Sequence, residues 1–244
     1  DILRLLLAAG VAQIGDPKQC HAVAIDGRAP KFDGGIVTRV DAVPFGIVVN
    51  AAARRFYDEG EDFWPKRYAI WGRLVAAEEG QIGHVIIDAK PVGRFMPPVF
   101  PPVIADSIGA LAGKLGLDAA VLETTIADFN RACRPGTFDP TIFDDCRTEG
   151  LEPAKTHWAM PIDTPPYRAY SLRPGITFTY LGVKVDAEAR VQMANGQAAQ
   201  NIFAAGEIMA GNVLGKGYLA GIGMTIGAVF GRIAGTEAAA HVGK

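Results

Sequence analysis

The sequence of 244 residues contains only three cysteines, and their spacing excludes two classes of protein. Cys20, Cys133 and Cys146 are too few and too scattered for a disulfide framework, and no two of them have the CxxC spacing of a zinc site. The four histidines stand far apart, so no HxxxH pair of metal ligands occurs. The sequence therefore predicts no metal site, and a reducing compartment, the cytoplasm, is the expected location.

A strong net charge and a long apolar run are also missing. The formal net charge is -2, which gives no bulk attraction to nucleic acid or to an anionic membrane, so no nucleic-acid partner is expected. No apolar run reaches the roughly 20 residues of a membrane-spanning helix. With 49% hydrophobic and 20% charged residues, the composition indicates a globular protein with one large or two modest domains. A few local arginines would still suffice to hold a small anionic molecule.

Periodicity and turn residues predict an alternation of helices and strands. The first half is expected to contain a helix over 65–79, a strand over 84–88 and helices over 103–114 and 118–132, with Asp118 as an N-cap. The proline-rich residues 91–102 are expected to form a loop. Short strands are expected over 168–172, 176–180 and 183–186, and the change of character near residue 166 predicts a domain boundary there.

The most informative segment runs from Asn201 to Gly235. An apolar strand ends on Gly206 and Glu207, and a glycine-rich loop over 211–223 leads into a helix of small residues over 222–240. Glycines allow the backbone to approach a flat ring, and a helix N-terminus presents free N–H groups and the positive end of a dipole. The pattern therefore suits an extended cofactor with an electron-rich edge, such as reduced flavin. A strand, loop and helix whose glycines only allow tight packing is the alternative.

This segment resembles the C-terminal flavin-contacting motif of the fumarate reductase/succinate dehydrogenase flavoprotein family. The strand end Ala-Ala-Gly-Glu, the glycine-rich loop and the helical Phe-Gly-Arg-Ile-Ala-Gly all match. The resemblance implies FAD as the cofactor and places Glu207 on its ribityl chain. The other cofactor contacts that it implies are Gly206, Gly221, Ile222, Gly223 and Met224. Tyr218 stands where relatives carry an arginine that binds a substrate carboxylate, so it is expected to contact the substrate.

A second stretch, over residues 55–68, resembles the part of the same family in which an Arg-Phe…Glu motif precedes a catalytic arginine. The resemblance implies that Arg67 donates or accepts the proton opposite the flavin and that Glu59 belongs to its relay. Without the resemblance, Arg67 would be interpreted as a surface charge on the 65–79 helix. The acidic residues before it would then simply favour the start of that helix.

A third stretch, Arg173–Asp186, resembles the family's PGxHHTMGG sequence, with Thr177 and Thr179 near the place of the substrate-binding histidine. The implied substrate contacts are Arg173, Thr177, Thr179, Tyr180 and Tyr218. The two threonines in place of the histidine, together with the sequence of residues 56–62, resemble the tricarballylate dehydrogenase branch of the family. That branch includes a related flavoprotein of cobalamin biosynthesis. A strand of β-branched residues is the alternative interpretation of the two threonines.

Over the whole chain, the resemblance implies an α+β capping domain plus the C-terminal part of an α/β, Rossmann-like FAD-binding domain. The expected ranges are 1–23 and 166–244 for parts of the FAD-binding domain and 24–165 for the substrate-capping domain. No GxGxxG follows a predicted strand. We therefore expect the pyrophosphate-binding N-terminal segment of the family to lie outside these residues and to act as a partner of this chain.

Three functions are compatible with these observations. The first is an FAD-dependent dehydrogenase or reductase acting on a CH–CH bond, with hydride transfer between a small anionic polycarboxylate such as tricarballylate and flavin N5. A membrane-bound electron-transfer partner would be compatible with it. The second is a flavoprotein of cobalamin biosynthesis, whose tetrapyrrole substrate needs a much larger pocket. The third is a non-catalytic domain fragment that binds no flavin alone.

Overall fold

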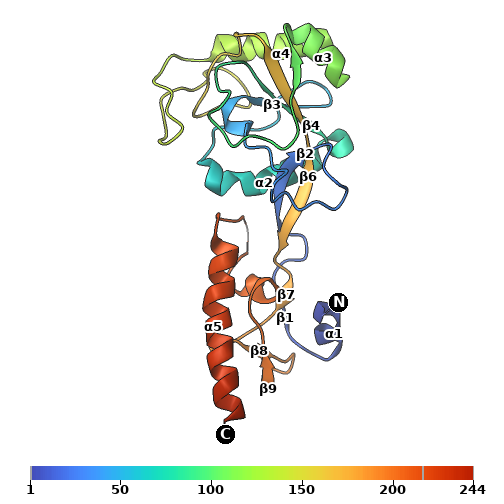
Figure 1. Ribbon diagram of the computed structural model, residues 1–244, viewed down its shortest axis with the longest axis vertical. Helices are drawn as coiled ribbons and strands as arrows, with labels where there is room; N and C mark the ends of the chain where they lie inside the picture. Colours follow the sequence, from blue (N-terminus) through green and yellow to red (C-terminus); the bar gives the residue numbers. More distant parts are fainter. Residues whose placement is uncertain (1, 216, 244) are drawn as a thin grey trace. The chain divides into compact units, whose positions relative to one another are not determined.

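The computed structural model describes residues 2–215 and 217–243, which form two compact units of mixed α and β structure (Figure 1). The central unit is Ala22–Ile176, and the terminal unit combines Asp1–His21 with Thr177–Lys244. The first division lies within two residues of the boundary expected near residue 23, and the second lies about ten residues after the one expected near residue 166. The functional roles of the two units stay predictions.

The central unit is built on one five-stranded sheet. Its strands are β2 (Cys20–Asp26), β3 (Ile47–Asn50), β4 (Gly83–Ile87), β5 (Val103–Ala105) and β6 (Tyr167–Thr179). The order is β2-β6-β4-β3, with β5 also paired to β6, and β4 runs antiparallel to both β3 and β6. The helices are α2 (Trp64–Ala77), α3 (Ile108–Leu115) and α4 (Ala119–Ala132), with short 3-10 helices η1 (Val43–Phe45) and η2 (Glu79–Gln81).

Both faces of this sheet are buried, because successive residues of a strand point to opposite sides. In β4, Ile86 packs in a core with Leu111 of α3 and Phe129 of α4, whereas its neighbour Val85 packs in a second core with Trp71 of α2. The central strands are therefore continuously apolar rather than alternating. This explains why residues 84–87 stood out as a strand in the sequence.

Local signals explain most of the helix ends. The Asp118 side chain accepts from the Val121 backbone N–H, which confirms the predicted N-cap of α4. Ser107 caps α3 in the same way, and left-handed Gly116 ends it. The predicted helix over 103–114 was therefore wrong at its start. Residues 103–105 form β5 instead, where Val103 is paired with Ala169 of β6.

The stretch from residue 167 also differs from the prediction. One 13-residue strand, β6, replaces the two short strands expected at 168–172 and 176–180. Pro174-Gly175 does not make a turn there. A Cβ at Gly175 would lie 2.6 Å from Cγ2 of Ile25, so this glycine permits the close approach of β2 to β6. Pairing with β4 and β5 keeps residues 167–176 in the central unit.

The terminal unit contains one long helix and two small sheets. Its elements are α1 (Ile2–Ala8), β1 (Gln13–Ile14), β7 (Gly182–Val183), β8 (Arg190–Gln192), β9 (Ala198–Phe203), the 3-10 helix η3 (Glu207–Asn212) and α5 (Ile222–Val242). Strand β1 pairs with β7, and β8 pairs with β9. Val11, Val183 and Met209 are in its core together with Ile226 of α5. The helix predicted over 222–240 is confirmed. Across the described ranges, no helix is both long enough and apolar enough to cross a membrane.

Candidate functional site

In the terminal unit, the strand end predicted to contact the cofactor adopts a conformation that needs glycine. Gly206 has φ +80° and directly precedes η3, where a side chain would strain the backbone. The next residue, Glu207, directs one carboxylate oxygen at Thr179. That oxygen accepts from the Thr179 backbone N–H at 2.9 Å and from its hydroxyl at 3.1 Å. The structure thus brings together a predicted cofactor contact and a predicted substrate contact.

The loop before α5 has the open backbone that a flat ring requires. Gly217 and Gly221 have φ of +75° and +89°, and a Cβ built on either would meet no atom within 4 Å. Gly221 precedes Ile222, the first residue of α5, and Met224 of its first turn is 83% exposed. The residues predicted to lie under the flavin therefore surround an accessible helix N-terminus. This arrangement fits an electron-rich ring edge.

Tyr218 lies against this helix start. Its hydroxyl accepts from the Gly223 backbone N–H at 3.0 Å, and its ring is stacked on His21 at 4.0 Å between centroids. A Cβ at Gly223 would lie 2.5 Å from the Tyr218 hydroxyl oxygen, so any larger residue there would displace the tyrosine. Phe178 contacts the same ring at 5.5 Å. Tyr218 and Gly223, predicted for substrate and cofactor respectively, are thus direct neighbours.

The other predicted substrate contacts are more dispersed. Tyr180 is fully buried, and its hydroxyl donates to the Gly217 carbonyl. Thr177 lies near the end of β6 and belongs to the terminal unit. Arg173 belongs to the central unit, where its guanidinium donates to the carbonyls of Ala29 (2.6 Å) and Pro30. Its contacts hold the loop that follows β2.

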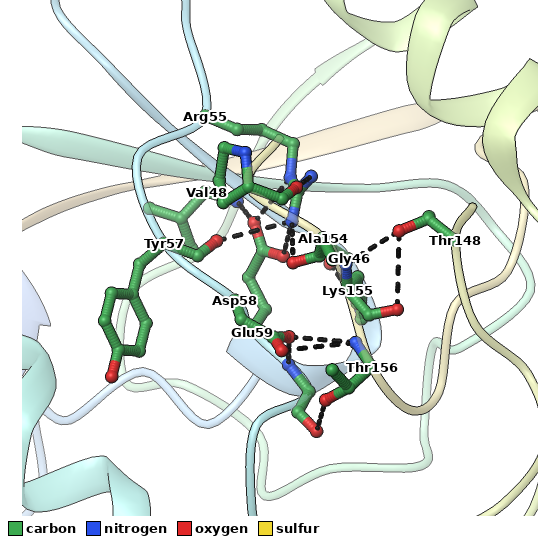
Figure 2. A network of polar contacts seen from close by, with 12 residues as sticks. Gly46, Val48, Arg55, Tyr57, Asp58, Glu59, Thr148, Ala154, Lys155 and Thr156 are labelled. Atoms are coloured by element: carbon green, nitrogen blue, oxygen red, sulfur yellow. Dashed lines mark hydrogen bonds and ion pairs between the residues drawn. The ribbon is translucent and has the colours of Figure 1, made fainter. Parts of the chain in front are cut away.

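In the central unit, Glu59 lies in a buried ion pair, as Figure 2 shows. The Arg55 guanidinium donates to both oxygens of the Glu59 carboxylate, at 2.6 and 3.1 Å, and the Val48 backbone N–H donates at 2.8 Å. The two side chains are 4% and 0% exposed. Contacts of this kind hold a loop against a strand, so they support a positioning role for Glu59.

Lys155 completes this buried network (Figure 2). Its ammonium donates to the carbonyls of Pro44 at 2.8 Å and Gly46 at 2.6 Å. Burial lowers the pKa of Lys155 from 10.5 to about 8, and the nearby Glu59 carboxylate opposes that shift. The network therefore ties residues 44–59 to the segment around residue 155. Nothing in the sequence marked Lys155, whereas Arg55 lay inside the quoted Arg-Phe motif without a predicted partner.

Arg67 is in the first turn of α2 and is partly exposed. Its guanidinium forms an ion pair with Glu61 at 3.0 Å and lies 4.0 Å from Asp62. The structure thus pairs Arg67 with these two carboxylates, while Glu59 is paired with Arg55. The carboxylate nearest to the Arg67 guanidinium is therefore Glu61, at 3.0 Å, and not Glu59.

A cavity of about 300 Å³ opens in the central unit, and the sequence did not predict it. Most of its lining is aromatic or proline, with two arginines and one aspartate among them. Asp41 forms an ion pair with Arg39 at 2.7 Å and also accepts from the indole N–H of Trp64. The lining residues are Arg39, Asp41, Pro44, Phe45, Phe63, Trp64, Pro65, Arg94, Phe95, Met96, Pro140 and Trp158.

Comparison with known proteins identifies the family. A family model described as an FAD binding domain matches residues 1–224, and the chain belongs to this family. A 4-oxocyclohex-2-ene-1-carboxylate 5-dehydrogenase of Sinomonas cyclohexanicum is 30% identical over 226 residues, which are 82% of this chain and 37% of that protein. A fumarate reductase (cytochrome) of Shewanella frigidimarina is 27% identical over 221 residues, 86% of this chain and 35% of that protein. The chain thus spans little more than a third of either relative.

Solved structures show the same fold. A 3-ketosteroid delta1-dehydrogenase from Sterolibacterium denitrificans superposes with a TM-score of 0.69 at 22% identity, over 98% of this chain and 46% of that one. A flavocytochrome c3 fumarate reductase in its open conformation gives 0.68 at 22% identity, over 98% and 39%. The predicted flavoprotein family and its cofactor, FAD, are confirmed, and the similar proteins are dehydrogenases and reductases.

Proposed function

We propose that this chain is part of an FAD-dependent oxidoreductase that transfers a hydride between flavin N5 and a carbon next to a substrate carboxylate. The observation that carries the proposal is the terminal unit's open glycine backbone before α5, next to the pair of Glu207 and Thr179. FAD supplies the hydride acceptor or donor when it is bound. The protein's part is to bind, orient and exclude water.

In this proposal the terminal unit is the C-terminal part of a Rossmann-like FAD-binding domain. Glu207 would accept hydrogen bonds from ribityl hydroxyls with Gly206 beside it, and the first turn of α5 would face the pyrimidine edge. The pyrophosphate would be held by a segment outside these 244 residues, because no GxGxxG follows a strand here. The central unit would cap the substrate.

Proton transfer is assigned to Arg67. Its ion pairs with Glu61 and Asp62 keep the guanidinium oriented. After Arg67 has given a proton to the substrate, either carboxylate could return one, once it has itself taken a proton from solvent. Glu59 is retained as a member of the relay from the family resemblance, but its bonds to Arg55 favour a positioning role. Arg173, Thr177, Thr179, Tyr180 and Tyr218 are proposed as substrate contacts.

For the substrate, the branch resemblance favours a polycarboxylate such as tricarballylate. The relative from Sinomonas, whose name specifies a carboxylate on a six-membered ring, supports a carboxylate more generally. The second candidate is a flavoprotein of cobalamin biosynthesis. A tetrapyrrole needs a much larger pocket than a small polycarboxylate, so the volume of the substrate pocket separates the two candidates. A membrane-bound electron-transfer partner and a cytoplasmic location complete the proposal.

The experiment uses the complete protein that contains this chain, titrated with FAD. Glu207→Gln should weaken FAD binding about tenfold, because a neutral amide is a poorer acceptor for ribityl hydroxyls than a carboxylate. The exposed Glu188→Gln, in the turn before β8, should leave FAD binding unchanged. A complete protein that binds no FAD would refute the proposal and leave the non-catalytic function.

A further inference from the structure

We propose that the cavity of the central unit binds a monocarboxylate whose body is a flat ring. The inference rests on the cavity's shape, its charge and the way its walls are held. The inference goes beyond the proposed function, because neither Arg67 nor the substrate contacts proposed above line this cavity, and its ligand is therefore proposed for a separate site.

The walls of the cavity are flat and apolar. Phe45 and Phe95 contact each other with ring centroids 5.6 Å apart, and Phe63 and Trp158 contact each other at 5.9 Å. All four line the cavity, together with Trp64. Aromatic faces favour another ring in an offset or tilted arrangement. A volume of about 300 Å³ is at the small end of ligand pockets and accommodates a ligand with one ring.

The charge of the lining fits one carboxylate. Of its two guanidinium groups, Arg39 is neutralised by Asp41 through two hydrogen bonds of 2.7 and 3.1 Å. The Arg94 guanidinium stacks over Phe138 at 5.3 Å, and among residues 2–215 and 217–243 no carboxylate lies within ion-pair distance of it. Arg94 is exposed at the cavity, so within the described ranges its positive charge is left without a protein carboxylate and can pair with a ligand.

A guanidinium of this kind can bind a carboxylate through two parallel hydrogen bonds. A tricarboxylate would bring three negative charges to this single uncompensated group, and would place two of them against aromatic walls. Because burying an unpaired charge is costly, the cavity discriminates against polycarboxylates.

One wall of the cavity is fixed before any ligand binds. Pro44 and Phe45 form this wall, and Lys155 donates to the carbonyls on both sides of Phe45, those of Pro44 and Gly46. The buried pair of Arg55 and Glu59 anchors the same region. A ligand therefore meets a wall that needs little reordering, which favours affinity.

The test is a titration of the full 244-residue chain followed by tryptophan fluorescence. Two of the three tryptophans, Trp64 and Trp158, line the cavity, while Trp71 is in the core under the sheet. Benzoate should change the emission with saturation. Its neutral analogue benzyl alcohol and the tricarboxylate tricarballylate should each bind at least tenfold more weakly.

Two variants locate the binding. Arg94→Gln should raise the Kd for benzoate at least tenfold, whereas Arg131→Gln, on an exposed arginine of α4, should leave it unchanged. Near-ultraviolet circular dichroism would establish that both variants fold. The inference is overturned if benzyl alcohol or tricarballylate binds as tightly as benzoate, if benzoate does not bind, or if Arg94→Gln leaves its Kd within twofold. Flavin takes no part in this titration, so such a failure would leave the FAD-binding test of the proposed function untouched.

Discussion

Replacing Glu59 by glutamine separates a structural from a catalytic role for this residue. The substitution keeps the shape and the acceptor for the Val48 N–H but removes the negative charge. Arg55 would then be buried without its anionic partner, next to the fully buried ammonium of Lys155. We therefore expect the central unit to be strongly destabilised.

The size of the effect follows from the burial of the pair. Arg55 and Glu59 are 2.6 Å apart and 4% and 0% exposed, so solvent screens little of their interaction. Breaking a buried ion pair by removing one partner costs about 3–5 kcal/mol. Domains have about 5–15 kcal/mol of stability, so the variant should still fold. With a urea slope of about 2 kcal/mol per molar, the unfolding midpoint should fall by about 2 M.

Urea unfolding monitored by tryptophan emission measures this unit selectively, because all three tryptophans lie in Ala22–Ile176. The matched control is Glu61→Gln, which removes a carboxylate in a partly exposed pair with Arg67 and should cost no more than about 1 kcal/mol. A loss below 1 kcal/mol in Glu59→Gln would refute the argument that this network is structural. Glu59 would then return to the catalytic relay.

Three further predictions follow from the titrating and functional groups. Burial lowers the pKa of His84 from 6.5 to about 4, so the unfolded chain takes up a proton before the folded chain does as pH falls. The free energy of unfolding should therefore drop by about 2 kcal/mol between about pH 7 and about pH 4.5. In urea unfolding, the stability of the His84→Asn variant should no longer depend on pH in this range. A variant with the same pH profile as the original protein would exclude His84 as the cause. In the complete enzyme, Arg67→Lys should reduce kcat far more than it raises KM, because lysine lacks the planar, forked guanidinium of arginine. Turnover near the wild-type value would remove Arg67 from the mechanism and make Arg173 the next arginine to test. The 244-residue chain alone should bind FAD weakly or not at all, and a version extended at its N-terminus tightly; stoichiometric flavin on the chain alone would contradict this.

Local features of the fold were predictable from the sequence. The N-cap at Asp118 was predicted because the capping residue and its partner, Val121, are only three positions apart. The start of α3 was not, because β5 forms through pairing with residues more than 60 positions away, such as Val103 with Ala169. Similarly, Pro174-Gly175 has the composition of a turn, and only the packing of Ile25 shows why the glycine is needed.

In the candidate site too, some features could be predicted from the sequence and others could not. The glycine-rich loop before α5 was predictable because it is local to one motif, whereas the cofactor contacts of Gly206, Glu207 and Gly221 stay predictions. The cavity was not predictable, because its lining comes from five separate stretches of the chain that meet only in the folded unit. The uncompensated charge of Arg94 depends on which carboxylate pairs with which arginine, and the sequence does not state this.

The most direct test of the account is anaerobic reduction of bound flavin in the complete protein that contains this chain. The protein should be purified with FAD and mixed with carboxylates that carry a CH–CH bond next to the carboxyl group, including tricarballylate and cyclohexanecarboxylate. At least one of them should bleach the visible absorbance of the flavin, and the Arg67→Lys variant should retain the flavin but bleach far more slowly. Bound flavin that no carboxylate reduces, and that is not reoxidised by an unsaturated carboxylate after chemical reduction, would contradict it.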